Sequence, residues 1–131
     1  MRIKTFVLLI SFCILPFSAS KIFCQSAKVR LLEDQKAMKR EVLKKIPVQS
    51  DLKNAWDVMK NSGFTCSDRK KSSVSEYDSK GRQIVHQNQD FLICSFTKKV
   101  SLYVNQNWSI AIVYINEKVT NIFVHISLTG L

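Results

Sequence analysis

The sequence predicts an α+β fold, with two N-terminal helices packed on one face of an antiparallel sheet of about four strands. Helix-spaced apolar residues extend to residue 59, and after Gly63 they give way to alternating apolar and polar residues. Short polar segments separate these alternating runs, as in strands joined by hairpins. Helices followed by hairpin-connected strands are typical of an antiparallel sheet with helices on one side. The 131 residues suffice for one domain with its own core.

The first 20 residues have the pattern of a secretory signal peptide. Arg2 and Lys4 precede an apolar run over residues 6–15, and residues 18–20 are small enough for a cleavage site. The run is shorter than the roughly 20 residues that a membrane-spanning helix needs. A buried N-terminal helix, a short anchor, or cleavage after Ser26 are the alternatives. Export through this signal predicts a periplasmic or secreted protein.

Residues 21–46 form the next unit, with a basic amphipathic helix over residues 28–46. Leu31, Met38 and Val42 lie on its apolar stripe, and its other face is rich in lysine and arginine. Like charges spaced by four residues weaken an isolated helix, so packing of the stripe must stabilise it. The cations proposed as a binding surface on this helix are Lys36, Lys39, Arg40 and Lys44.

The α+β domain proper spans residues 47–131 and opens with a second, shorter helix. Ser50 is its predicted N-cap, and Asp51 places a negative charge in the first turn, where the helix dipole favours it. Gly63 is the predicted left-handed residue that ends the helix. The apolar face of this helix consists of Leu52, Ala55, Trp56 and Met59.

Strands follow Gly63, and the alternation of apolar and polar residues locates them. Residues 68–82 are charged and serine-rich, which predicts a long exposed loop or a hairpin. Residues 116–118 form a tight connection before the last strand, whose even-numbered apolar residues share one face. The predicted strand segments are 64–66, 91–96, 100–104, 108–114 and 122–128.

Several short motifs resemble a family of small, uncharacterised exported bacterial proteins. These are similar to the two-helix-plus-sheet architecture of the outer-membrane assembly lipoprotein BamE (SmpA/OmlA) and of the repeats of β-lactamase inhibitory protein. The resemblance covers residues 46–131 and implies the fold and export, but no catalytic residue. Gln49 stands where a glycine is expected, and the missing lipobox leaves outer-membrane anchoring unsupported. The motifs are Pro47-Val48, Ala55, Met59, Gly63-Phe64-Thr65-Cys66, Phe91-Leu92-Ile93-Cys94, Trp108, Tyr114, Lys118-Val119-Thr120 and Leu128-Thr129-Gly130.

Cys66 and Cys94 are the predicted disulfide. Each lies in a predicted strand, and adjacent antiparallel strands bring Cα atoms within about 6 Å. Export places them where thiols oxidise. Two buried free thiols, or a metal site shared with His86 and His125, are the alternatives. Cys24 is then a free thiol able to form a dimer, or it is removed with the signal.

The remaining signals point to binding and not to catalysis. No nucleophile motif, metal-ligand spacing or cofactor motif is present, so we expect a non-enzyme without a metal or cofactor. Export and the lack of an RNA-binding aromatic pattern argue against nucleic acid. We therefore expect a cell-envelope or secreted protein-binding module; an inhibitor or immunity protein against an exported enzyme or toxin, or an enzyme of unknown type, are the alternatives.

Positive charge suggests where such a module would bind. The chain has a formal net charge of +10. Without Arg2 and Lys4, the 20 basic residues become 18, which against 10 acidic residues gives +8. The expected partner is an unknown protein or an anionic envelope component, and a basic helix also suits peripheral contact with an anionic membrane. A solvated, solubilising face is the simpler reading. The second basic cluster comprises Arg69, Lys70 and Lys71.

Overall fold

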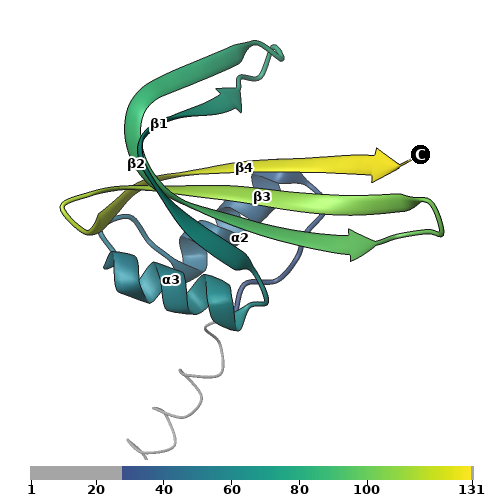
Figure 1. Cartoon of the computed structure of the whole chain (residues 1–131), viewed down its shortest axis with the longest axis horizontal. Helices are drawn as coiled ribbons and strands as arrows, with labels where there is room; N and C mark the ends of the chain where they lie inside the picture. The colour runs from purple at the N-terminus through teal and green to yellow at the C-terminus, as the bar shows by residue number, and fades with distance from the viewer. Residues whose placement is uncertain (1–27, 131) are drawn as a thin grey trace, which may run out of the picture.

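The computed structural model describes residues 28–130, which form two helices and one antiparallel four-stranded sheet (Figure 1). The predicted α+β class and the number of strands are confirmed. The strands follow one another in the order β1-β2-β3-β4, so β1 and β4 are the edges. The predicted signal peptide and Cys24 lie outside the described residues. The elements are α2 (Gln35–Lys45), α3 (Leu52–Asn61), β1 (Thr65–Tyr77), β2 (Gln83–Lys99), β3 (Val104–Ile115) and β4 (Lys118–Gly130).

The helix α2 begins after Asp34, so the predicted start at residue 28 was wrong. The Asp34 side chain accepts a hydrogen bond of 2.8 Å from the N–H of Ala37, which makes Asp34 the N-cap. The backbone before it bonds to distant groups. For example, the Leu32 carbonyl accepts a hydrogen bond of 2.8 Å from the Trp108 indole N–H. These tertiary partners replace the helical bonds that the apolar spacing alone suggested.

The helix α3 agrees with the sequence reading except at its first residue. Asp51 is the N-cap in place of Ser50, whose hydroxyl donates to the Pro47 carbonyl. At the other end Gly63 has a φ of 92°, the left-handed conformation predicted for it. The N–H of Phe64 then reaches back to the Met59 carbonyl at 3.1 Å, so the helix ends with its last carbonyls satisfied.

The strands are longer than the sequence indicated, and one predicted strand is a turn. For residues 68–82 the hairpin alternative is correct, because β1 continues to Tyr77. Residues 100–104 were predicted as a strand, but residues 100–103 connect β2 to β3, and the N–H of Val100 donates to the Val104 carbonyl at 2.9 Å. The tight connection at residues 116–118 is confirmed, with Asn116 and Glu117 both at positive φ, as a two-residue hairpin turn requires.

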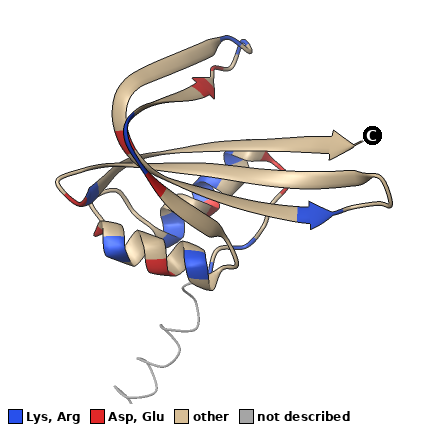
Figure 2. Cartoon of the chain, in the orientation of Figure 1, with Lys and Arg blue, Asp and Glu red and all other residues tan. Residues whose placement is uncertain are grey.

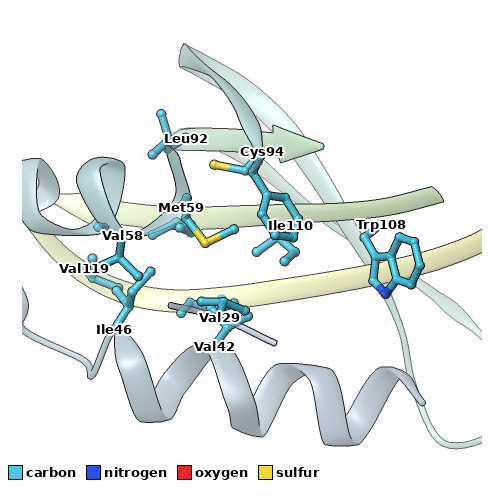
Figure 3. Close-up of a cluster of buried hydrophobic side chains, with 14 of the residues drawn as sticks. Val29, Val42, Ile46, Val58, Met59, Leu92, Cys94, Trp108, Ile110 and Val119 are labelled. Atoms are coloured by element: carbon cyan, nitrogen blue, oxygen red, sulfur yellow. The ribbon is translucent and has the colours of Figure 1, made fainter. Parts of the chain in front are cut away.

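Two buried clusters occupy different positions along the same strands. The larger cluster joins Met59 and other helical residues to Leu92 and Ile110 of the central strands (Figure 3). The smaller cluster uses the intervening strand positions, such as Phe91 and Ala111. Because successive strand residues point to opposite faces, the sheet buries apolar side chains on both faces. Trp108 is 2% exposed in the larger cluster, and the partly buried Trp56 packs against that cluster.

The predicted disulfide between Cys66 and Cys94 is present. The two residues are directly opposite in the β1–β2 register, and their Cα atoms are 4.1 Å apart. Their sulfurs are therefore bonded to each other and neither free nor ligands of a metal. Among residues 28–130, no helix has the length and apolar character needed to cross a membrane.

Candidate functional site

The outer half of the β1–β2 hairpin bends away from the sheet to form an arm, residues 72–86 (Figure 1). At its base the β1–β2 register shifts twice between residues 69 and 74. Lys71 and Asn88 there have φ of 48° and 58°, and the Asp90 carboxylate accepts a hydrogen bond from the Lys71 N–H at 2.9 Å. Bulges of this kind bend both strands, so they direct the arm back over the sheet.

Apolar and aromatic contacts hold the arm over one face of the sheet. Val74 of the arm belongs to the smaller buried cluster, together with Phe123 of β4. The His86 ring stacks on the Phe123 ring, with centroids 5.1 Å apart and 17° between the planes. Nearer the tip, the Tyr77 and His125 rings are 6.1 Å apart. The arm therefore reaches from one edge of the sheet toward the other, and we call the covered face the arm face.

A pocket of about 480 Å³ lies between the arm and the arm face. Its floor is apolar, with Phe91 and Phe123 6% and 7% exposed, and its volume is within the usual range for ligand pockets. Its wall is the arm itself, whose mostly polar residues from Ser72 to Tyr77 line the pocket. An apolar floor with a polar wall suits a ligand whose apolar end reaches the floor and whose polar groups lie beside the wall.

No family model, curated protein or solved structure matches the chain. The resemblance to BamE-like proteins and to β-lactamase inhibitory protein therefore stays a prediction.

Lys and Arg residues recur along α2 (Figure 2), and most of the predicted basic residues of this helix are exposed. Lys36, Arg40 and Lys44 are exposed, whereas Lys39 is half-buried. The Lys39 ammonium is 5.7 Å from the centroid of the Phe123 ring, within reach of a cation–π contact. Lys39 thereby connects the predicted basic helix to an aromatic side chain of the pocket floor.

The three predicted cations of β1 have three different environments. Arg69 lines the pocket. Lys70 donates to the Tyr114 hydroxyl at 2.5 Å, and that hydroxyl donates to Asp68 at 2.7 Å. The hydrogen bond to Tyr114 raises the pKa of Lys70, and burial raises the pKa of Tyr114. Lys71 is at the bulge, so the structure divides this cluster among the pocket, a tyrosine contact and a backbone bend.

The pocket itself was missed by the sequence reading, although a signal for it was present. Residues 91–94 and 110–114 are continuous apolar runs, which are typical of strands buried on both faces. Glu41, on the basic helix, is 5% exposed, and its carboxylate is 3.6 Å from the Arg30 side chain. Arg30 precedes the helix, so helical spacing could not indicate this ion pair.

The two histidines bear on any chemistry at the site. His86 Nε2 is buried without a hydrogen-bond partner, 3.8 Å from the Glu76 carboxylate. His125 is directly opposite Ser109 in the β3–β4 register, yet no hydrogen bond joins their side chains. Within the described part of the chain, no group of three or more His, Cys, Asp or Glu residues is arranged to hold a metal ion.

Proposed function

We propose that this chain is an exported, non-enzymatic binding module that holds a partner protein on the arm face. In this proposal the two helices cover one face of the sheet and leave the arm face for the partner. Support comes from the two buried clusters, because residues of α2 and α3 belong to the larger cluster, whereas the smaller cluster contains strand residues alone.

The observation that carries the proposal is the pocket between the arm and the sheet. Phe91 and Phe123 form an apolar floor at the base of a hollow with a polar wall. Protein interfaces concentrate their binding energy where an anchor side chain enters such a pocket and is shielded from water by its rim. Arg69 and Glu76 add one charge of each sign to the lining, which suits a partner with polar groups around an apolar anchor.

Two observations support an exported, periplasmic or secreted location. The signal-peptide pattern of residues 1–20 predicts export. The disulfide between Cys66 and Cys94 is of the kind that persists in oxidising compartments.

The proposal assigns binding without catalysis to this pocket, which is lined by four serines and by His125. A serine nucleophile needs a base within hydrogen-bond reach, and Ser109 has no hydrogen bond to His125 in the described structure. Ser72 donates to the Lys70 carbonyl, so its hydroxyl serves the bend of the arm.

The test fills the pocket and asks whether the partner is lost. Tagged wild-type protein, Ser109→Trp and Ser75→Trp would be used to capture proteins from envelope extract and culture fluid under oxidising conditions, with identification by mass spectrometry. Ser109 and Ser75 both line the pocket, one from β3 and one from the arm. The matched control is Thr65→Trp, at an exposed position of β1 that does not line the pocket.

A partner that wild type and the control capture, and both pocket variants lose, supports the proposal. Far-ultraviolet circular dichroism and melting temperatures must show that the variants are folded. Equal capture by all four proteins, or no captured protein, contradicts the proposal.

A further inference from the structure

We infer that the partner inserts an extended peptide segment that pairs with the free edge of β1 in the arm, as an added β-strand. The inference rests on the proposed function and specifies how the partner binds. The juxtaposition behind it is a pocket that lies between two strand edges.

The pocket lining follows the edge of β1 and not one of its faces. Side chains of successive strand residues point to opposite faces, so a pocket on a face is lined by every second residue. Here six consecutive residues of β1, from Ser72 to Tyr77, line the pocket. A hollow that touches all six must lie beside the strand, where its main-chain groups point.

Among residues 28–130, no strand pairs with those main-chain groups. In the sheet order β1 is the first strand, and β2 occupies its other side. The N–H of Asp78 donates to the Arg82 carbonyl at 2.9 Å at the end of the hairpin. Antiparallel pairing alternates, and the register from residue 74 to 77 has no irregularity, so the N–H groups of Ser75 and Tyr77 point away from β2. They face the pocket side as unpaired donors.

The opposite wall of the pocket is the edge of β4, and it is open at one place. Side chains cap two outward N–H groups of β4: Gln35 accepts from Ile126 at 3.1 Å, and Asn121 accepts from Ile122 at 2.8 Å. By alternation the N–H of Val124 also points outward, and among the described residues no side chain caps it. Val124 lines the pocket, together with its neighbours Phe123 and His125.

The edge is thus capped on both sides of the pocket and uncapped within it. Unprotected strand edges are costly because they pair with other chains, and proteins normally cover them. Addition of an extended peptide uses such an edge, with main-chain bonds supplying affinity and alternate side chains supplying specificity. One set of alternate side chains would point to the floor at Phe91 and Phe123, which favours apolar residues there.

The test separates main-chain pairing from side-chain contact. The probes are an acetylated and amidated peptide of alternating valine and threonine, and the same peptide with N-methyl groups on alternate residues. N-methylation removes main-chain donors on one edge and keeps the side chains. Binding would be followed by amide chemical shifts and hydrogen exchange of the full-length oxidised protein.

The unmodified peptide should slow exchange at Ser75, Tyr77 and Val124 by about tenfold when free peptide is at about ten times Kd. Ser75→Pro removes one outward donor and should abolish that protection, since proline is tolerated on an edge strand. Ser75→Ala keeps the N–H group and should bind as wild type does.

Equal binding of the N-methylated peptide, protection at other amides, or no protection with either peptide overturns the inference. So does a dimer paired through β1 in native mass spectrometry, because the occupant would then be a second copy. If the pocket variants lose a captured partner while neither peptide protects these amides, the proposed function stands and strand addition fails. If the unmodified peptide protects them but no partner is captured, strand addition stands and the proposed function fails.

Discussion

Reduction of the disulfide between Cys66 and Cys94 should destabilise the domain by about 3–4 kcal/mol. The two cysteines are 28 residues apart in the sequence. Closing a loop of that length lowers the entropy of the unfolded chain, which raises the free energy of the unfolded state by this amount. A domain of this size is stable by about 5–15 kcal/mol, so the loss is a large part of the total. The loss should be largest in β1, which is an edge strand that pairs with β2 alone among the described strands.

The measurement is urea unfolding of the oxidised protein and of the protein in a phosphine reductant, followed by tryptophan fluorescence. Trp108 is 2% exposed in the native state, so its emission should change on unfolding. The reduced protein should also have a larger m-value, because its unfolded chain exposes more surface. The control is the double variant Cys66→Ala, Cys94→Ala, which retains Cys24 and should not respond to the reductant. A difference below about 1 kcal/mol between the oxidised and reduced wild type would refute the loop-closure reasoning.

Two further predictions concern the turns. Gly63→Ala should lower the free energy of unfolding by about 1–2 kcal/mol, because an alanine is strained at a φ of 92°. The loss should be larger still, because the new Cβ would be 3.2 Å from a ring carbon of Phe96. Gly81→Ala, at a φ of 77° with nothing within 4 Å, should cost the backbone part alone, so equal losses would contradict a role for Phe96. Hydrogen bonding, chiefly from the N–H of Arg82, lowers the pKa of Asp78 below 3.8. Its contribution to stability is then complete above that unfolded-state value and lost as the pH falls through the lower folded-state pKa. The melting temperature of Asp78→Asn should therefore differ from wild type near neutral pH and converge with it in acid, and a constant difference would contradict this assignment.

The sequence could predict the parts of the fold that local patterns determine. The helical spacing of apolar residues around Met59 and the glycine after α3 predicted the second helix. The alternation of apolar and polar residues predicted the sheet. The predicted disulfide between Cys66 and Cys94 also indicated that these residues are opposite each other in neighbouring strands, because a disulfide requires close Cα atoms. The start of α2 could not be obtained in this way, since the residues before Asp34 are held by Trp108, which lies far along the chain.

The candidate site was harder to predict because its wall looks like a loop. Residues 68–82 are polar and charged, and their strand structure depends on pairing with β2. The bend that turns the hairpin into an arm arises at Lys71 and Asn88, neither of which is a glycine. Left-handed backbone at such residues is set by the surrounding structure, here including the bond from Lys71 to Asp90.

The bulges divide β1 into two segments with different roles. Before the bulges, β1 is bonded to β2 through the disulfide, and Cys66 packs against the larger cluster. Beyond them, the strand leaves the sheet with β2, and its free edge runs along the pocket. A straight hairpin would expose that edge to solvent along its whole length, whereas the bent arm turns it toward β4. The bend thus turns an unpaired edge toward the pocket, while the side chains of Gln35 and Asn121 cap N–H groups of β4 on either side of it.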